Sequence, residues 1–225
     1  MLLVIDVGNT GTVVGVVDGD DVVARWQVTT VPRTVDEYVL AIEALLAAGG
    51  VRVDEAALAS VVPEATRVLR EALPRVTGTA PVVVGPGVRT GLSIDLDNAR
   101  EVGADRVAGA VGAIDRYGAP VMTVGIGAEA LVASTSALRR VELSVPSHAV
   151  GRSTVEAMQS GMVLGFAGLV DGLVSRLREE AGIDPRAVVA TGGFAPLVGP
   201  LCREVTDIDA DLTLWGLALI HRRNR

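Results

Sequence analysis

The sequence predicts an α/β protein in which mixed β-sheets are flanked by helices. Short runs of β-branched residues alternate with Gly, Asn and Asp turns over the first 28 residues, as in a meander of antiparallel strands. Helical and strand patterns then alternate through the rest of the first half, as in sheets whose strands are joined through helices. Apolar residues make up 49% of the 225 residues, which is enough to bury a core in each of two domains.

The first half of the chain is expected to run in the order βββαβαβ. A helix is predicted over residues 34–48, because Tyr38 and Ile42 fall on one face at helical spacing. Gly49 stops this helix, and Pro63 opens the next one. The expected strands are residues 2–6, 12–17, 22–28, 57–62 and 82–84.

The second half is expected to begin with a long helix over residues 98–117, capped by Asn98. The domain boundary is placed on this helix, which gives a first domain of residues 1–106 and a second of residues 107–225. Ser153 and Glu156 have the spacing of a capping box. The remaining elements are expected as strands at 121–124, 187–190 and 204–206, helices at 129–138, 153–181 and 211–222, and a loop at 144–151.

Four glycines share one face of the predicted helix 153–181. Glycine costs about 1 kcal/mol in a helix interior, so a close backbone contact is expected to offset the loss. That contact is either with the chain's own sheet or with a second subunit, and the sequence does not favour one over the other. The glycines are Gly161, Gly165, Gly168 and Gly172.

Composition excludes several classes of function. The net charge of −7 and the lack of a basic run argue against nucleic acid and anionic membranes as partners, because both require a basic face. The single Cys202 excludes an intramolecular disulfide and favours a reducing cytoplasm. The apolar start of the chain ends at Asp6, so no signal peptide is expected, and no segment is expected to approach membrane-spanning length. A small metabolite or another protein is the expected partner.

Asp6 ends an apolar strand directly before a turn of small and hydroxyl residues, Gly8, Asn9 and Thr10. Such a turn can aim backbone N–H groups at phosphate oxygens, and the neighbouring carboxylate can hold Mg²⁺ through water. The alternative is a plain hairpin, for which the turn residues suffice. A carboxylate at the end of so apolar a strand must be solvated, paired or bound to a cation, which weakens the hairpin alternative.

Three further Gly-containing segments are candidates, the first in the predicted helix 98–117 and the other two in turns. After Gly103, Asp105 can act as a general base and Arg106 can bind a substrate carboxylate through two hydrogen bonds. The alternative is that Asp105 merely complements the helix dipole and pairs with an arginine. Gly192 and Gly193 can admit a nucleotide against bare backbone, or form an ordinary loop between strand and helix. The turn at 85–91 can shape a pocket, or simply reverse the chain.

Taken in order, these motifs resemble the type III pantothenate kinases of bacteria, which belong to the actin-like superfamily of sugar kinases, acetate kinase and heat-shock chaperones. The resemblance covers nearly the whole chain and implies two actin-like, ribonuclease H-like domains. The motifs that carry it are DVGNT at 6–10, SVVP at 60–63, GPG and TG within 85–91, DN and EVGADR within 97–106, TVEAMQSG at 154–161, ATGG at 190–193 and DLTLWGL at 211–217.

The resemblance implies a reaction and a set of cofactors. The family transfers the γ-phosphoryl group of ATP to pantothenate, the first step toward coenzyme A, with Mg²⁺ and in several members a monovalent cation, K⁺ or NH₄⁺. By the resemblance, Asp6 organises Mg²⁺ and phosphate. The residues that it places against the nucleotide are Gly8, Asn9 and Thr10 in the first phosphate loop, and Gly192 and Gly193.

The resemblance also implies the substrate side of the site. Asp105 is the expected general base on the pantothenate hydroxyl, and Gly103, Arg106 and Thr154 are expected at the pantothenate site. Members of the family are dimers whose pantothenate pocket lies near the subunit interface. This implies a homodimer here and favours the subunit-interface interpretation of the glycine face.

The sequence departs from the family at one major point. The family has a second phosphate loop, D-F-G-T-A-T, after the strand that is 121–124 here, followed by a hairpin and a G-G-x-I-x-P-G turn. This chain instead passes directly into GIGAEAL at 125–131, so a β-hairpin is missing and the second domain is expected to be shortened. Smaller departures are Gly11 for Asn or Ser, Leu96 for Tyr, Ala99 for Pro and Ser153 for Asn.

Two functional hypotheses follow. The first is a pantothenate kinase with impaired activity, in which another element, such as a complete paralogue in a mixed dimer, supplies the missing phosphate contacts. The second is a non-catalytic family member that acts as a regulator or partner subunit. Retention of Asp6, Asp105, Arg106 and Thr154 favours ligand binding, whereas loss of the second loop favours the non-catalytic class.

Overall fold

The computed structural model describes residues 1–98, 101–127 and 142–225. The chain divides into two compact units: unit 1 comprises Met1–Gly112 with Asp211–Arg225, and unit 2 comprises Ala113–Ala210. The helix predicted at 129–138 lies outside the described residues. The predicted domains, 1–106 and 107–225, differ from this division mainly at the end of the chain, where the last helix belongs to unit 1.

Unit 1 is built on a five-stranded mixed sheet in the order β3-β2-β1-β4-β5. The first three strands are antiparallel neighbours, and β4 and β5 run parallel to β1. This confirms the predicted order βββαβαβ, because the turns after β1 and β2 fall where Gly, Asn and Asp separate apolar runs. The strands are β1 (Leu2–Val7), β2 (Gly11–Asp18), β3 (Asp21–Thr29), β4 (Glu55–Ser60) and β5 (Val82–Val83).

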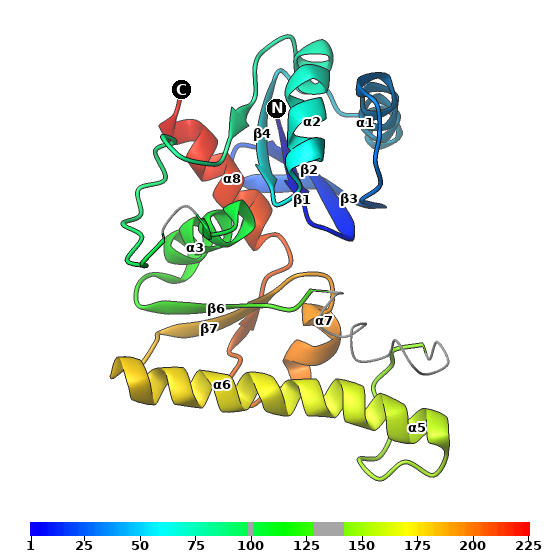
Figure 1. The fold of residues 1–225 in the computed structure, drawn as a ribbon, viewed down its shortest axis with the longest axis vertical. Helices are drawn as coiled ribbons and strands as arrows, with labels where there is room; N and C mark the ends of the chain where they lie inside the picture. The colour runs from blue at the N-terminus through cyan, green and yellow to red at the C-terminus, as the bar shows by residue number, and fades with distance from the viewer. Residues whose placement is uncertain (99–100, 128–141) are drawn as a thin grey trace. The chain divides into compact units, whose positions relative to one another are not determined.

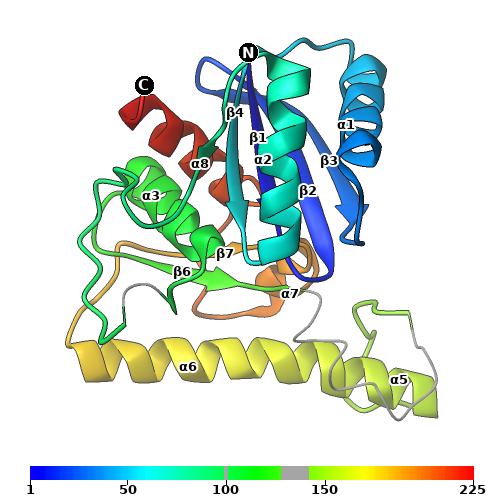
Figure 2. The ribbon, with the colours of Figure 1, turned by 45° about the horizontal axis from the view of Figure 1, so that its top comes forward.

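Helices cover both faces of this sheet (Figures 1 and 2). One face packs with α1 (Val35–Gly49) and α2 (Pro63–Thr77) around Leu3, Ile5 and Val7 of β1. The other face, around Leu2 and Val4, packs with α3 (Ala104–Tyr117) and α8 (Leu212–Arg223). Thr34 and Glu37 cap α1 with a full capping box, so the helix begins at Val35, one residue after the predicted start.

The last helix belongs to unit 1 because its apolar side chains complete the core of that unit. Leu214, Leu217 and Ile220 of α8 are buried in the cluster that contains Leu2 and Val4. An ion pair of 3.2 Å between Arg25 Nε in β3 and Asp211 Oδ1 holds the start of the helix against the same sheet. The predicted second domain, 107–225, includes this helix, but its buried face belongs to unit 1.

Two glycines allow α3 and α8 to touch backbone to backbone. A Cβ atom at Gly216 would lie 1.8 Å from the carbonyl oxygen of Ala108, and one at Gly112 would lie 2.4 Å from that of Leu212. Both distances are far below van der Waals contact, so no larger residue fits at either position without separating the helices.

The helix predicted from Asn98 begins only at Ala104. The side chain of Asn98 bonds that of Glu101, and the Glu101 N–H donates to the Asn98 carbonyl, which makes a turn rather than the first turn of a long helix. Helical periodicity alone does not distinguish these two arrangements, because a turn before a helix can continue its apolar spacing.

Unit 2 has a parallel sheet in the order β6-β7-β8 among its described residues. Its strands are β6 (Val121–Gly125), β7 (Ala187–Thr191) and β8 (Asp207–Ile208). The last strand was predicted at 204–206, three residues early, because so short a strand is defined by pairing with β7 rather than by a pattern of its own. The helices are α5 (Thr154–Gln159), a π-helical turn (Ser160–Leu164), α6 (Gly165–Ala181), α7 (Ala195–Val198) and a 3₁₀ turn (Gly199–Leu201).

The helical stretch Thr154–Ala181 is continuous and, at 28 residues, long and apolar enough to cross a membrane by length and composition alone. The expectation that no segment approaches that length is therefore wrong. One face accounts for part of the apolarity: Val163, Ala167, Val170 and Val174 are buried against the unit 2 core.

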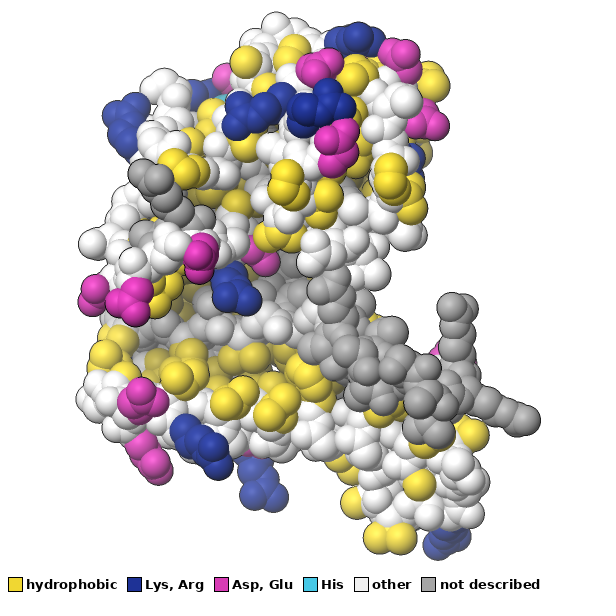
Figure 3. All heavy atoms as spheres, viewed as in Figure 1, with side chains coloured by type: hydrophobic (Ala, Val, Ile, Leu, Met, Phe, Trp, Pro, Cys, Tyr) yellow, Lys and Arg dark blue, Asp and Glu magenta, His cyan; other side chains and the backbone are white. Residues whose placement is uncertain are grey.

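The opposite face of this helix is open. No described atom lies within 4 Å of a Cβ placed on Gly161, Gly165, Gly168 or Gly172. Packing of these glycines on the chain's own sheet, one of the two interpretations of the sequence, is therefore wrong for the described residues. Hydrophobic side chains run along the helix in Figure 3, and three leucines flank the glycines with about half of their surface exposed: Leu169 (52%), Leu173 (50%) and Leu177 (47%).

Candidate active site

Asp6 lies near the carboxyl end of β1, the central strand of the unit 1 sheet. Side chains alternate along a strand, so Asp6 faces the same side as Leu2 and Val4, the side that carries α3. The parallel neighbour β4 ends beside it, with Ala59 in register with Asp6. Ligands of open α/β sheets bind at the carboxyl ends of the strands, which makes this edge the candidate site.

The carboxyl group of Asp6 is electrostatically unusual. Burial, and to a lesser extent the negative charge of Asp105, raises its pKa from 3.8 to about 7. The effect of that charge identifies the two carboxyl groups as neighbours. Asp6 still keeps part of its surface open, so a ligand can reach it. A carboxyl group that ionises near neutral pH can exchange its proton for a cation without a large cost.

Asp105 lies in the first turn of α3, and its carboxylate fills the space beside the backbone of Gly103. A Cβ at Gly103 would lie 2.3 Å from Asp105 Oδ1 and 3.5 Å from Val61 Cγ1, so no side chain fits there beside the carboxylate. The same Oδ1 atom is buried and has no hydrogen-bond partner in the part of the chain that the structure describes. A buried carboxylate oxygen without a partner is costly, and a bound cation or substrate hydroxyl would satisfy it.

The turn after β1 is fixed by hydrogen bonds. The Gly8 N–H donates to the Gly11 carbonyl at 3.0 Å, and the Thr30 N–H donates to the Thr10 carbonyl at 3.0 Å. The Thr30 hydroxyl donates to the Gly8 carbonyl at 2.8 Å. The side chains of Asn9 and Thr10 are exposed at the tip of the turn. The turn therefore has one conformation that presents its tip to solvent.

The turn at 85–91 lies against the end of α8. The Asn224 side chain pairs with the backbone of Arg89, accepting from its N–H at 3.0 Å and donating to its carbonyl at 2.9 Å. Arg223 donates to the Thr90 carbonyl. These bonds fix the conformation of the turn against the end of α8.

The other predicted site residues are divided between the two units. Arg106 is exposed on the first turn of α3 in unit 1. Thr154 is exposed in the first turn of α5 in unit 2, where Ser153 caps the helix by accepting from the Glu156 N–H. In unit 1, Asp105 lies close to Gly103 and its charge acts on Asp6, the residue that precedes the turn after β1 by two positions.

Gly192 and Gly193 follow β7 in unit 2. Gly192 has φ +97°, and a Cβ there would lie 2.7 Å from the Ile126 carbonyl oxygen, so only glycine fits. Ile126 bonds the loop on both sides, donating to the Thr191 carbonyl at 2.8 Å and accepting from the Phe194 N–H at 3.1 Å. Gly193 is exposed, so the loop presents bare backbone at the carboxyl end of β7.

The pair Asp6 and Asp105 fits Mg²⁺. This ion keeps several water ligands and is usually bound through one or two carboxylates plus substrate phosphates. A cation held by these carboxylates would satisfy the Asp105 oxygen, which has no partner among the described residues, and would favour the ionised form of Asp6. Among the described residues no group of three or more His, Cys, Asp and Glu side chains could hold a metal, so the protein offers this pair rather than a closed cage.

The ligand-free protein is expected to lose stability as the pH rises from about 4 to about 7. In this range the folded protein keeps the Asp6 proton while the unfolded chain loses it, so rising pH favours the unfolded state. Asp6→Asn removes the titrating proton and should exceed the wild type in stability at about pH 8 by a few kcal/mol, since one pKa unit corresponds to about 1.4 kcal/mol. Thermal unfolding of both proteins across this pH range measures the difference, and equal pH slopes would contradict the raised pKa.

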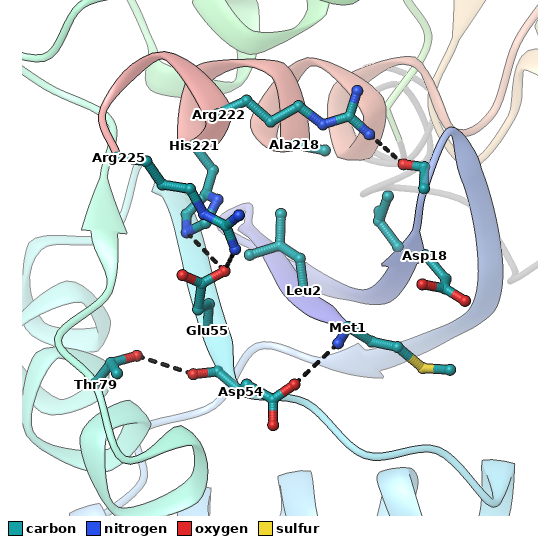
Figure 4. A pocket seen from close by; sticks show the side chains of 12 residues that line it. Met1, Leu2, Asp18, Asp54, Glu55, Thr79, Ala218, His221, Arg222 and Arg225 are labelled. Atoms are coloured by element: carbon teal, nitrogen blue, oxygen red, sulfur yellow. Dashed lines mark hydrogen bonds and ion pairs between the residues drawn. The ribbon is translucent and has the colours of Figure 1, made fainter.

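A cavity of about 660 Å³ lies at the other end of the same sheet, around the start of β1 (Figure 4). His221 of α8 is buried there with Nε2 3.9 Å from Glu55 Oε2, and burial lowers the pKa of the imidazole. Arg225 also pairs with Glu55, and Arg222 pairs with Asp20 at 3.0 Å. Arg222 and Arg225 at this end of the sheet are thus already paired with carboxylates. At the carboxyl end of β1, by contrast, the Asp105 oxygen has no partner among the described residues.

Comparison with known proteins identifies the family. The family model for type III pantothenate kinase matches residues 2–128 and 124–176. A type III pantothenate kinase of Anaeromyxobacter sp. (strain K) is 40% identical over 255 aligned positions, which cover 100% of both chains. Type III pantothenate kinase 2 of Symbiobacterium thermophilum is 42% identical over 259 positions, covering 100% of this chain and 97% of that protein.

The chain belongs to the type III pantothenate kinase family. The resemblance seen in the seven sequence motifs is thereby confirmed, and with it the family's reaction, the ATP-dependent phosphorylation of pantothenate in coenzyme A biosynthesis.

Solved structures agree on the fold of this pantothenate kinase family member. Component A of the (R)-2-hydroxyglutaryl-CoA dehydratase of Acidaminococcus fermentans aligns with a TM-score of 0.56 and 13% identity, covering 98% of this chain and 95% of that chain. A ROK family glucokinase from Streptomyces griseus, solved with glucose and AMPPNP, aligns with a TM-score of 0.50 and 16% identity, covering 98% and 99%. At such identities the likeness shows the fold alone, and it confirms the predicted actin-like α/β class.

The pantothenate kinase alignments are longer than this chain. The alignment with the Anaeromyxobacter protein has 255 positions and the chain has 225 residues, so at least 30 aligned positions have no residue here. The two matches of the family model overlap at residues 124–128, a stretch that begins within the end of β6. The sequence comparison with the family's second phosphate loop points to this same place.

The sequence does not identify every residue that shapes this site. Thr30, which bonds the turn after β1 from 22 residues away, carries no motif signal, because a threonine at the end of a strand is ordinary. Gly112 and Gly216, which set the position of α3, are also unremarkable in sequence. Gly216 lies within the family motif at 211–217, which is the one signal that could have pointed to it.

Proposed function

We propose that this chain phosphorylates pantothenate with ATP at the carboxyl end of β1, at a rate reduced by the loss of the second phosphate loop. The observation that carries the proposal is the pair Asp6 and Asp105. One carboxyl group has its pKa raised to about 7, and the other has a buried oxygen without a hydrogen-bond partner among the described residues. Carboxyl groups perturbed in this way mark sites that bind cations or move protons.

The chemistry assigned to Asp105 is proton transfer. Asp105 accepts the proton of the pantothenate hydroxyl while the hydroxyl oxygen bonds to the γ-phosphorus of ATP, and the bond from that phosphorus to the bridging oxygen breaks to leave ADP. Arg106, exposed on the same helical turn, and Thr154 are proposed to bind pantothenate, Arg106 through its carboxylate. Asp6 would hold Mg²⁺, which supplies charge neutralisation at the phosphates.

The nucleotide is proposed to lie against Gly8, Asn9 and Thr10 and against the backbone of Gly192 and Gly193. The exposed turn tip and the φ of Gly192 support this proposal. Enzymatic phosphoryl transfer depends almost wholly on positioning and charge stabilisation. Loss of one of two phosphate loops should therefore cost several kcal/mol of transition-state stabilisation, about three decades in rate or more.

The second candidate is a non-catalytic family member that binds a ligand and acts as a regulator, or as partner subunit of a complete paralogue. The absence of D-F-G-T-A-T after β6 favours it, because that loop carries an Asp and Thr hydroxyls facing the β- and γ-phosphates in the family. Mixing the chain with such a paralogue and measuring turnover per subunit tests this candidate. A partner subunit changes the turnover of the paralogue, whereas a protein that does not associate with it leaves the turnover unchanged.

Calorimetric titration with pantothenate, and separately with Mg²⁺ and ATP, tests the proposal. A coupled assay of ADP release, with mass-spectrometric detection of phosphopantothenate, follows. Binding of both ligands with slow turnover supports the impaired kinase. Pantothenate binding without ATP binding supports the non-catalytic alternative, and no binding of either ligand would contradict both.

Repeating the assay in K⁺, NH₄⁺ and Na⁺ salts shows whether a monovalent cation is required. ATP and pantothenate as substrates are consistent with the proposed cytoplasmic location.

We also propose that the chain forms a homodimer through the open face of α6. The four glycines with no described neighbour and the three half-exposed leucines support this proposal, since a large apolar patch on a soluble protein usually marks an interface. Gly165→Leu fills the open space and should give monomers in analytical ultracentrifugation. Leu40→Glu, a matched change at an exposed leucine of α1, should leave the mass unchanged. A monomeric wild type, or a Gly165→Leu variant of unchanged mass, would contradict this interface.

A further inference from the structure

Thr30 and Thr12 form a hydroxyl relay beneath the turn after β1. The Thr30 hydroxyl donates to the Gly8 carbonyl at 2.8 Å, and the Thr12 and Thr30 hydroxyl oxygens lie 2.9 Å apart. A hydroxyl has one proton, so the Thr30 proton is used at Gly8 and Thr12 must be the donor to Thr30. The chain of donors therefore runs from Thr12 through Thr30 to the Gly8 carbonyl.

This relay lies on the face of the sheet opposite to Asp6. Thr12 is in register with Val7, which packs in the core shared with α1 and α2, whereas Asp6 faces α3. Thr12 is 3% exposed, so the first hydroxyl group of the relay is buried in the core. From this side, the hydroxyls can act on the candidate site only through the backbone of the turn.

The relay sets the orientation of one peptide group in this turn, the one that follows Gly8. Gly8 lacks a Cβ, and one placed there would lie 3.0 Å from the Gly11 carbonyl oxygen, which is a tight contact. The Gly8 N–H is bonded within the turn, and its carbonyl is held by Thr30 alone among the described hydrogen bonds. Without the Thr30 hydroxyl, the peptide that joins Gly8 to Asn9 loses the bond that sets its orientation.

We propose that Thr30 is a positioning residue for phosphate binding, acting through the Gly8 carbonyl to orient the turn of residues 8–11. The inference rests on the proposed function, because it assumes that this turn holds the phosphates of ATP. It assigns to Thr30 no contact with the nucleotide. Preorganised backbone dipoles bind phosphate well because they need no reorganisation when the ligand arrives, so a turn that loses its orientation binds phosphate more weakly.

The test is the affinity for Mg²⁺ with AMPPNP, measured by calorimetry, in variants of Thr30. Thr30→Val removes the hydroxyl at nearly constant volume and should weaken binding about tenfold, the size expected for one lost hydrogen bond that fixes the turn. Thr30→Ser keeps the hydroxyl and should restore affinity to within about twofold. Thr77→Val is the matched control, since the Thr77 hydroxyl also donates to a carbonyl, that of Leu73 at 3.0 Å, at the far end of α2.

A double variant separates positioning from stability. Thr30→Val alone leaves the buried Thr12 hydroxyl without its acceptor, so its melting temperature should fall. Adding Thr12→Val removes that unpaired group and should return the melting temperature toward the wild-type value while the affinity stays low. If affinity recovers together with the melting temperature, Thr30 is merely structural and the proposal is wrong.

The outcomes for the inference and for the proposed function are distinct. A wild type that binds the nucleotide while Thr30→Val binds it equally well overturns the positioning role and leaves the proposed function intact. A wild type that binds no nucleotide overturns the phosphate role of the turn and the inference with it. Where turnover is measurable, KM for ATP should rise in Thr30→Val while KM for pantothenate stays constant, and equal rises in both would contradict the proposal.

Discussion

Replacing Asp105 with asparagine is expected to lower kcat for pantothenate phosphorylation about a thousandfold, within the range known for loss of a general base. Asparagine keeps the size of the side chain beside Gly103 but cannot accept the hydroxyl proton. Pantothenate affinity, measured by calorimetry, should change by less than about twofold, because the proton moves only in the transition state.

The starting rate of this chain is itself expected to be low, so the comparison requires single-turnover measurements with excess protein. Asp115→Asn, at an exposed position of the last turn of α3, is the matched control and should leave kcat unchanged. Asp105→Asn should also lower the pKa of Asp6, since one cause of its rise is the Asp105 charge. Unchanged turnover in Asp105→Asn would refute the role of general base.

Gly216→Ala is expected to destabilise the protein by about 3 kcal/mol or more, because overpacking a tight contact forces the backbones apart. The new Cβ would lie 1.8 Å from the Ala108 carbonyl oxygen and 3.1 Å from the Gly112 amide nitrogen, and all of these atoms are backbone. A rotamer change cannot relieve such a collision, so α8 must move away from α3. The movement would open the core cluster around Leu214 and Leu217.

The matched control is Gly109→Ala on the same helix pair. A Cβ at Gly109 would meet only Thr213 Oγ1, at an ordinary 3.8 Å, so alanine should be neutral or stabilise the helix by about 0.5–1 kcal/mol. The melting temperature of Gly216→Ala should therefore fall by about 6 °C or more in a domain of this size, while that of Gly109→Ala should stay equal or rise. A Gly216→Ala protein that melts at the wild-type temperature would contradict the backbone contact.

Local chemistry explains which parts of the fold were predictable. The start of α1 was predictable because Thr34 and Glu37 have the spacing of a capping box. The first three strands were predictable because turns of Gly, Asn and Asp separate runs of β-branched residues. β8 was misplaced because two residues paired to β7 have no periodicity of their own. The start of α3 was misplaced because the Asn98 turn and a helical N-terminus look alike in sequence.

The candidate site was predictable in its residues but not in its physics. The family motifs name Asp6 and Asp105, and the structure shows that the charge of one carboxyl group raises the pKa of the other. Periodicity placed the glycines of helix 153–181 on one face, but it cannot say which face meets the sheet, and that depended on Val170 and Val174. The Thr30 bond to Gly8 joins residues 22 positions apart, and such a pairing exists only once β3 lies beside β2.

The division of unit 1 into two sequence segments also determines the order in which the protein can be completed on the ribosome. Unit 2, a single continuous segment, has all of its residues available before α8 is made. The face of the unit 1 sheet that bears Leu2 and Val4 must wait for α8 to supply its covering side chains, although those strands are the first part of the chain to be synthesised. During most of translation this apolar face lacks its closing helix, and it is then the surface on which a chaperone would act.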